Sequence, residues 1–218
     1  MNFVVVGANG KFGSEICKRL KALSHNVYQI DKEDNIEDLR NMNISAIIDV
    51  SNAKNSLKSL YFAQNNSIPI IIGCTGHSQE DIEIIINASK QIPVFLSYNF
   101  SIGILALKKA LEKMLEYCPN SAYIFEMHHS HKKDAPSGTA KEIIEIVKDS
   151  STEIKNVECI REGKVVGVHE ICLFWNNEYI KISHDAQNRD CFVDGAVKAV
   201  EFIASAKVGF YGMNNLNF

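Results

Sequence analysis

Apolar strands alternate with amphipathic helices through the first hundred residues, and this alternation constrains the fold more than any other feature. Strands are expected at residues 2–6, 26–30, 46–50, 69–72 and 92–96. Apolar residues recur at helical spacing after the first of them, as at Phe12, Ile16 and Leu20. Strands that alternate with helices pair in parallel through right-handed crossovers. The segment is therefore predicted to form a doubly wound α/β domain.

The pattern changes after Asn99. Helices are expected at residues 102–117, 139–148 and 195–205, and strands at 122–128, 153–160, 169–175 and 178–183. Strands that follow one another closely indicate an antiparallel or mixed sheet, so a second, α+β domain is predicted. Residues 209–218 are expected to be irregular. The expected domains are residues 1–100, completed by 190–218, and residues 101–189.

Composition excludes several classes of protein. Hydrophobic residues make up 46% and charged residues 22% of the 218 residues, as in ordinary globular proteins. The net charge of -3 gives no support to nucleic-acid binding. Apolar runs such as residues 68–72 are far shorter than the roughly 20 residues that span a bilayer. The six cysteines are scattered, without a Cys-x-x-Cys pair, which favours reduced thiols in a cytoplasmic protein.

A glycine-rich turn links the first strand to the first helix. Gly7-x-x-Gly10-x-x-Gly13 permits a tight turn and a close backbone approach to a pyrophosphate. Glycines alone are a weak signal, and a purely structural turn is the alternative. Asp31, at the end of the second strand, can accept hydrogen bonds from ribose hydroxyls, whereas Lys32 can pair with a 2′-phosphate. NADH, NADPH or both are therefore expected, bound by Gly7, Ala8, Asn9, Gly10, Lys11, Phe12, Asp31 and Lys32.

Two further segments follow the fourth and fifth strands. In a parallel sheet, the carboxyl ends of the strands lie at one edge and face the ligand. Each segment alone is typical of a plain turn, but their matched positions favour contact with a nicotinamide. The added cofactor-binding candidates are Gly73, Cys74, Thr75, Ser97, Tyr98, Asn99 and Phe100.

The most unusual segment is residues 126–140. It has three histidines and two lysines between His128 and Lys133, followed by Pro136-Ser137-Gly138-Thr139, which is suited to starting a helix. Imidazoles exchange protons near neutral pH, and lysines bind carboxylates. A helix N-terminus offers free backbone N–H groups to an anion. The segment therefore predicts chemistry on a small acidic molecule.

This segment has two alternative interpretations, a metal site and a solvated polar loop. Imidazoles bind zinc, but adjacent histidines in an extended chain point to opposite sides, and Lys132 and Lys133 would repel a cation. No metal is therefore expected. A solvated polar loop would not explain the helix start that follows. Glu126 and Asp134 are expected to be structural. Arg161 is equally typical of a site and of a surface.

The run Glu126-x-His128-His129-x-x-Lys132-x-Asp134-Ala135-Pro136-Ser137-Gly138-Thr139-Ala140 resembles the signature of the dihydrodipicolinate reductases. This family, also called 4-hydroxy-tetrahydrodipicolinate reductases, acts in lysine and diaminopimelate biosynthesis. The resemblance covers nearly the whole chain, including residues 6–13, 73–76, 99–103 and 161–169. The chain departs from the family in two places. The segment after Asp31 is shorter than usual, and Cys74 stands where the family usually has threonine.

The resemblance implies a Rossmann-like domain, an inserted substrate-binding domain with a mixed sheet, and a homotetramer. It implies hydride transfer from NADH or NADPH to a cyclic imine dicarboxylate, giving tetrahydrodipicolinate. By match to the signature, His128 takes the acid/base role and Lys132 donates a proton. The substrate carboxylates are assigned to His129, Lys132, Ser137, Gly138 and Thr139. Another Rossmann oxidoreductase, such as an amino-acid dehydrogenase, and a nonenzymatic dinucleotide sensor are the rival functions.

Overall fold

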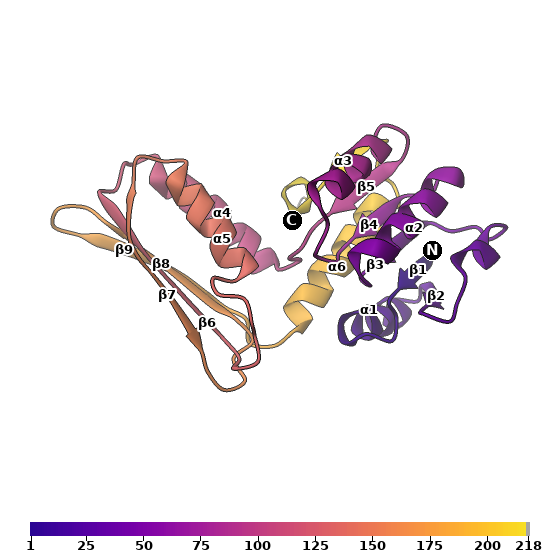
Figure 1. Ribbon diagram of the computed structural model, residues 1–218, viewed down its shortest axis with the longest axis horizontal. Coiled ribbons are helices and arrows are strands. Elements are labelled where there is room, and N and C mark those ends of the chain that lie inside the picture. Colours follow the sequence, from indigo (N-terminus) through magenta and orange to yellow (C-terminus); the bar gives the residue numbers. More distant parts are fainter. Residues whose placement is uncertain (217–218) are drawn as a thin grey trace. The chain divides into compact units, whose positions relative to one another are not determined.

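The computed structural model describes residues 1–216 and divides into two compact units (Figure 1). The first is Met1–Phe100 together with the chain from Phe192 onward, and the second is Ser101–Cys191. Each unit has its own sheet and its own hydrophobic core. Among residues 1–216, every helix is too short or too polar to cross a lipid bilayer.

The first unit is built on a six-stranded sheet in the order β10-β5-β4-β3-β1-β2, with every pair parallel. Its strands are β1 (Asn2–Val6), β2 (Asn26–Ile30), β3 (Ala46–Asp49), β4 (Ile70–Ile72), β5 (Pro93–Leu96) and β10 (Gly209–Tyr211). Its helices are α1 (Lys11–Ala22), α2 (Ala53–Asn65), α3 (Gln79–Ala88) and α6 (Asp190–Ile203), with 3-10 turns η1 (Ile36–Leu39) and η2 (Met213–Asn215). This is the doubly wound arrangement that the sequence predicts.

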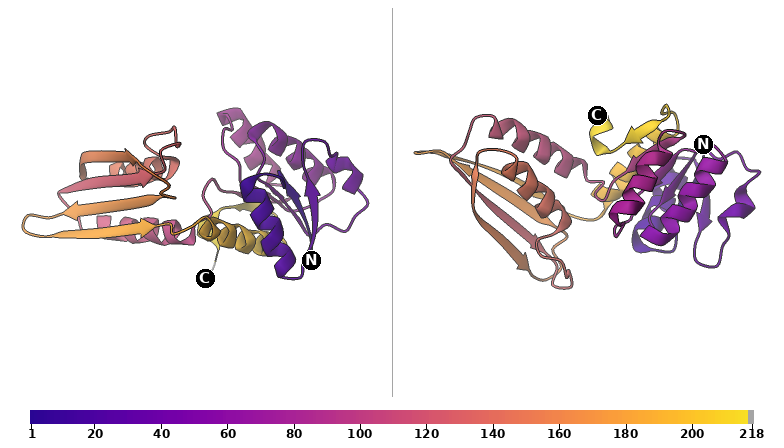
Figure 2. Two further views of the ribbon diagram at one scale, coloured as in Figure 1. Left: turned by 90° about the horizontal axis from the view of Figure 1, so that it is seen from below. Right: turned by 45° about the horizontal axis from the view of Figure 1, so that its top comes forward.

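Both faces of this sheet are covered, because successive strand residues point to opposite sides. Phe3 and Val5 pack with α1 and α6 in one core, whereas Val4 and Val6 belong to the core beneath α2 and α3. Helices on both faces explain why the strands are continuous apolar runs rather than alternating ones. The views in Figure 2 show the same layering.

The expectation of an irregular tail is wrong for Gly209–Tyr211, which forms β10 and pairs with β5. Tyr211 also packs edge-on against Phe202 of α6, with ring centroids 5.3 Å apart. A three-residue strand that contains glycine has too little periodicity to be recognised from sequence. Residues 217–218 of the expected tail lie outside the described residues.

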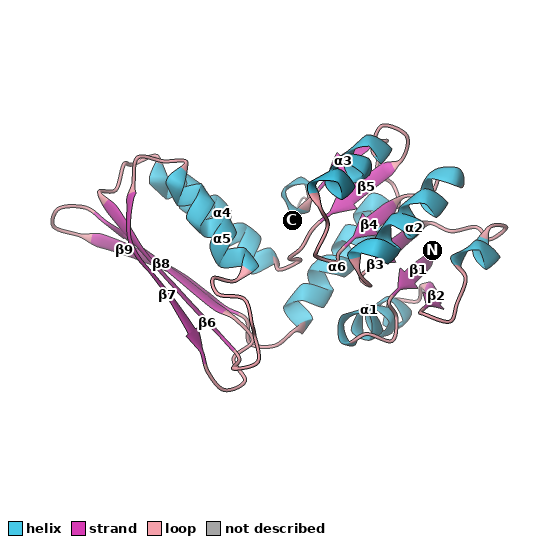
Figure 3. Cartoon of the chain, viewed as in Figure 1, coloured by secondary structure: helices cyan, strands magenta, loops and turns pink. Residues whose placement is uncertain are grey.

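The second unit is a four-stranded sheet in the order β7-β6-β8-β9, with two helices on one face (Figure 3). Its elements are α4 (Ile102–Leu115), β6 (Ser121–His128), α5 (Gly138–Lys148), β7 (Glu153–Arg161), β8 (Val168–Phe174) and β9 (Tyr179–Asp185). β6 runs parallel to β7 and antiparallel to β8, so the sheet is mixed, as predicted. Along β6, burial alternates and places Ile124, Glu126 and His128 together on the buried face.

Gly195 lets α6 lie directly against the backbone at Phe100. A Cβ at this position would lie 1.8 Å from the Phe100 carbonyl oxygen, so either α6 or the segment between β5 and α4 would have to move. We expect Gly195→Ala to lower the free energy of unfolding by about 1–3 kcal/mol, measured by denaturant titration. Gly212→Ala is the matched control, because its Cβ would meet Leu96 O at an ordinary 3.4 Å. Equal stability of the two variants would contradict the packing argument.

Candidate functional site

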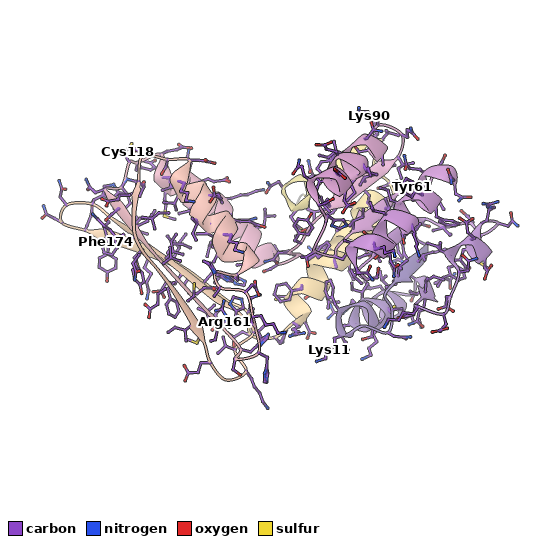
Figure 4. The ribbon with its side chains drawn as sticks, viewed as in Figure 1. Lys11, Tyr61, Lys90, Cys118, Arg161 and Phe174 are labelled. Carbon is purple, nitrogen blue, oxygen red and sulfur yellow. The ribbon has the colours of Figure 1, made fainter. Side chains whose placement is uncertain are left out.

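The turn after β1 brings the backbone of three segments close together. Gly7 has a φ of +84°, and a Cβ there would lie 3.0 Å from the backbone of Ser51. A Cβ at Gly13 would lie 2.2 Å from the Gly7 carbonyl oxygen. Glycine is therefore required at both positions. The helix α1 begins at Lys11, labelled in Figure 4, and has no side-chain cap at Gly10. Its first N–H groups are thus suited to binding an anion.

A cavity of about 510 Å³ opens at the carboxyl ends of β1, β2 and β3. These strands flank the point where the strand order reverses, which is where open α/β sheets bind ligands. Five of the predicted cofactor residues line it, namely Gly7, Asn9, Gly10, Asp31 and Lys32. Of the other candidates in the turn, Ala8 is buried, and Lys11 and Phe12 belong to the first turn of α1.

Asp31 joins the end of β2 to the glycine turn. Its two carboxylate oxygens accept hydrogen bonds from the backbone N–H groups of Asn9 and Lys32, each at 2.8 Å. The hydrogen bond from Asn9 is the main cause that lowers the pKa of Asp31 below its usual range. Each oxygen keeps a second lone pair, so the carboxylate can still accept bonds from hydroxyl groups.

Sequence reasoning missed one wall of the cavity. This wall comes from the segment that follows β3 and from the first turns of α2, and it is lined by Val50, Ser51, Asn52, Asn55, Lys58 and Ser59. The available signal was the sheet order. Because β3 lies next to β1, its carboxyl end has to face the same crevice.

The candidates after β4 and β5 do not line this cavity, but they lie beside each other. Ser97 N donates to Ile72 O at 3.1 Å, and a Cβ at Gly73 would lie 2.9 Å from the Phe100 ring. The Phe12 and Phe100 rings are 6.0 Å apart, which links this group to α1. Cys74 is buried, and burial raises the pKa of its thiol, so the thiol stays protonated at neutral pH.

In the second unit, Glu126 is fully buried at the centre of a polar cluster. Its Oε1 accepts hydrogen bonds from Ser137 N at 3.0 Å and from Arg161 Nη2 at 2.6 Å. Burial opposes ionisation, but the bonds from Ser137 and Arg161 outweigh it and lower the pKa of Glu126 to about 2. Arg161, labelled in Figure 4, also donates to the Asp134 carbonyl and so joins β7 to the loop after β6.

His128 and His169 lie beside this carboxylate. His128 Nδ1 is 3.0 Å from Glu126 Oε2, and His169 Nε2 is 3.9 Å from the same oxygen. Burial lowers the pKa of both imidazoles, that of His169 to about 4. Both histidines are therefore neutral at neutral pH. His169 also lies 3.2 Å from Ser137 Oγ, which joins β8 to the start of α5.

The loop after β6 holds the remaining predicted residues. Lys132 Nζ pairs with Asp134 Oδ1 at 2.9 Å, and the Lys132 backbone N–H donates to His129 O. The His129 and His131 rings are 6.4 Å apart, so they do not face each other closely. Of these groups, Lys132 is half-buried, and His131 is exposed.

The helix α5 begins where this loop ends. Ser137 caps it by accepting a hydrogen bond from Ala140 N at 3.2 Å. Within residues 1–216, no neighbouring atom lies within 4 Å of a Cβ placed at Gly138, and the first turn has no acidic residue. Open space at a helix N-terminus, where the backbone N–H groups point outward, is suited to a carboxylate. Thr139, the next candidate, lies in the same first turn.

The structure also brings together a set of possible metal ligands that differs from the three histidines of residues 128–131. Within residues 1–216, ligand atoms of Glu126, His128 and His169 lie within 4.8 Å of one another. The Arg161 guanidinium, however, already neutralises the same carboxylate at 2.6 Å. A second cation beside it would be repelled, so the cluster favours hydrogen bonding over metal binding.

Comparison with known proteins assigns the family. The model described as "Dihydrodipicolinate reductase, N-terminus" matches residues 1–100, and "Dihydrodipicolinate reductase, C-terminus" matches residues 103–216. The chain belongs to the dihydrodipicolinate reductase family. The 4-hydroxy-tetrahydrodipicolinate reductase of Alkaliphilus oremlandii is 32% identical, over 99% of this chain and 98% of the relative. That of Thermosipho africanus is 34% identical, over 99% and 97%.

Solved structures agree on the fold. "Dipicolinate bound Dihydrodipicolinate reductase from Paenisporosarcina sp. TG-14" superposes with a TM-score of 0.84 at 17% identity, covering 99% of each chain. A probable dehydrogenase from Thermotoga maritima has a TM-score of 0.67 at 11% identity, covering 98% of this chain and 92% of that one. Both the Rossmann-like sheet and the second mixed sheet expected for a dihydrodipicolinate reductase are thereby confirmed.

The buried neutral histidines predict a loss of stability in mild acid. The pKa of His169 is about 4 in the folded chain and roughly 6.5 when unfolded, so the unfolded chain binds more protons as pH falls below about 6.5. Between pH 7.5 and 5, His169 should steepen the fall in unfolding free energy by up to about 1.4 kcal/mol per pH unit. Denaturant titrations should show a shallower slope for His169→Gln, and an unchanged slope would contradict this.

Proposed function

We propose that this protein is a 4-hydroxy-tetrahydrodipicolinate reductase, which uses NADH or NADPH to reduce a cyclic imine dicarboxylate to tetrahydrodipicolinate. The observation that carries the proposal is the juxtaposition in the second unit of buried His128, half-buried Lys132 and the open start of α5 at Gly138. These groups supply proton exchange, positive charge and N–H donors within one loop. The two relatives that match this chain over both of its units are each named 4-hydroxy-tetrahydrodipicolinate reductase.

The first unit is proposed as the cofactor-binding domain, and its residues fit a dinucleotide. The glycine turn admits a close backbone approach, and α1 begins without a side-chain cap, as a pyrophosphate requires. Asp31 has lone pairs for ribose hydroxyls, whereas Lys32 and Lys58 line the same cavity and suit a 2′-phosphate. When bound, the nicotinamide supplies the hydride. Gly73–Thr75 and Ser97–Phe100 are proposed to contact it.

The second unit is proposed to bind the substrate by its carboxylates. The N–H groups at Gly138 and Thr139 and the side chains of His129 and Lys132 are the donors, with Ser137 fixing the helix start. A helix N-terminus contributes about 0.3–1 kcal/mol to a nearby anion. Charge-assisted hydrogen bonds contribute about 1.5–3 kcal/mol each, so the lysine is the larger contributor. Its pair with half-exposed Asp134 is weak enough to be exchanged for a substrate carboxylate.

Proton supply is proposed to come from Lys132 and His128. Reduction of an imine leaves negative charge on the ring nitrogen system, and a proton donor beside it lowers the barrier. A positioned acid is worth roughly 10²–10⁴ in rate. The Lys132 ammonium is the proposed donor, and neutral His128 can accept or relay a proton.

A homotetramer is proposed, with the second unit as its contact domain. One face of its sheet carries α4 and α5, whereas the other has aromatic side chains at Tyr123, Phe125, Phe174 and Tyr179. Phe174 and Tyr179 are 37% and 63% exposed, a surface suited to a second copy of the chain.

The six free cysteines support a reducing location, the cytoplasm, and no nucleic-acid or membrane partner is proposed.

The rival functions are less well supported. A dinucleotide sensor needs neither Lys132 nor an open helix start, and an amino-acid dehydrogenase would not share the long run from Glu126 to Ala140 with these reductases. The test follows the oxidation of NADH and NADPH by absorbance at about 340 nm. The substrate, dihydrodipicolinate, is made in situ by the synthase that acts before the reductase in lysine biosynthesis. Oxidation that depends on the synthase supports the proposal. No oxidation by folded protein that binds a nucleotide would favour the sensor or another imine.

Lys132→Ala should lower turnover by roughly 10²-fold or more, because the proton donor is lost. The affinity for NADH, measured by fluorescence titration, should change little, since the cofactor residues lie in the other unit. Lys133→Ala is the matched control, because its exposed side chain has no assigned role. Equal losses of turnover and NADH affinity in Lys132→Ala would rule out the role as acid.

Asp31→Ala should weaken NADH binding by roughly 10-fold or more, because a charge-assisted bond to ribose is worth about 1.5–3 kcal/mol. Glu33→Ala, a nearby exposed carboxylate that does not line the cavity, should bind NADH like the parent protein. Isothermal titration with NADH and NADPH measures both variants. Unchanged NADH binding in Asp31→Ala would place the ribose elsewhere.

A further inference from the structure

The carboxylate of Glu126 has one oxygen that is used and one that is not. Oε1 accepts bonds from Ser137 N and Arg161 Nη2. Oε2 is buried and has no hydrogen-bond partner among residues 1–216, although His128 Nδ1 lies only 3.0 Å away. Strand geometry explains the proximity, because residues two apart on β6 share a face. The buried Oε2 atom of Glu126 can therefore form a hydrogen bond with the neighbouring imidazole nitrogen of His128.

The facing atom of His128 is in the same condition. Nδ1 is buried and has no hydrogen-bond partner within the described chain. The 3.0 Å separation suits a hydrogen bond, but the ring nitrogen is not directed at the oxygen. A rotation of the imidazole would satisfy both atoms at once. Because a buried polar atom without a hydrogen bond is costly, the hydrogen bond between His128 Nδ1 and Glu126 Oε2 is favoured once a substrate holds the ring.

The other ring nitrogen faces a position without a side chain. A Cβ at Gly167 would lie 3.0 Å from His128 Nε2, so any larger residue there would press on this atom. Gly167 thus leaves room at Nε2 while Glu126 stands at Nδ1. The two sides of the imidazole are therefore different, because a carboxylate lies beside Nδ1 and a residue without a side chain lies beside Nε2.

We propose that Glu126 is a positioning residue for the reaction, which holds the proton of His128 on Nδ1 and so makes Nε2 the atom that exchanges a proton with the substrate. Arg161 keeps Glu126 ionised and in place through Oε1. This inference rests on the proposed function, in which His128 is the acid or base. It assigns to Glu126 and Arg161 a role beyond fixing the loop.

The charges around His128 set the direction of the expected effect. The groups that face it are Glu126 on β6, Arg161 on β7 and His169 on β8, with Lys132 and Asp134 on the loop. Burial lowers the pKa of His128, and Lys132 and Arg161 lower it further, whereas Glu126 is the largest influence that raises it. Removing the charge of Glu126 should therefore lower the pKa of His128. Removing that of Arg161 should raise it.

The kinetic test compares Glu126→Gln with Glu158→Gln, an exposed carboxylate on β7 that contacts Tyr123. Glu126→Gln should lower kcat by roughly 10²-fold with the KM for NADH unchanged. The limb of the kcat–pH profile that disappears in His128→Gln should move to lower pH, and Glu158→Gln should keep the parent profile. A loss of kcat that is equal at every pH would overturn the proposal in favour of a structural role.

A second measurement needs no substrate and keeps the inference separate from the proposed function. Proton NMR titration of the histidine rings, with His128 identified by its absence in His128→Gln, reports its pKa in the folded protein. The pKa should fall by about 1 unit in Glu126→Gln. It should rise in Arg161→Gln, which serves if the first variant does not fold. Shifts in the opposite directions, or none, overturn the inference, whereas failure of the parent protein to reduce dihydrodipicolinate would refute only the proposed function.

Discussion

The ion pair between Glu126 and Arg161 holds the second unit's site together. One carboxylate oxygen receives the guanidinium from β7 and the backbone N–H at the start of α5, and Arg161 reaches the loop carbonyl of Asp134 as well. Sheet, loop and helix start are thus joined at a single buried charge. Because such a charge is tolerated only when paired, the pair constrains every neighbour, including His128.

The two candidate sites differ in the groups that they offer to an anion. In the first unit, the groups suited to an anion are backbone N–H groups at a glycine turn, and the carboxylate of Asp31 beside them is itself held by two backbone bonds. In the second unit, side-chain charges on a loop are added to a helix start. Neutral histidines beside them, such as His169, keep the polar cluster from accumulating positive charge.

Periodicity was sufficient to predict the strands β1–β9, most of the helices and the two sheets, because a buried strand and an amphipathic helix have distinct apolar patterns, but it missed the short strand β10. Contacts across strands were not predictable. Glu126 meets His169 only because β6 pairs with β8 in one register, and the cavity wall at Ser51 follows from β3 lying next to β1. Both require the sheet order, which local pattern does not contain. The sequence alone therefore does not distinguish a site residue from a surface residue at Arg161, which pairs with Glu126 in the structure.

The return of the chain to the first unit has a consequence for synthesis on the ribosome. One core of that unit needs Val193, Val197 and Val200 of α6, and its sheet edge needs β10. These segments leave the ribosome only after the whole of Ser101–Cys191. The inserted unit is therefore complete before the first unit, so the strands β1–β5 wait with one apolar face covered by α1 alone while the later half emerges.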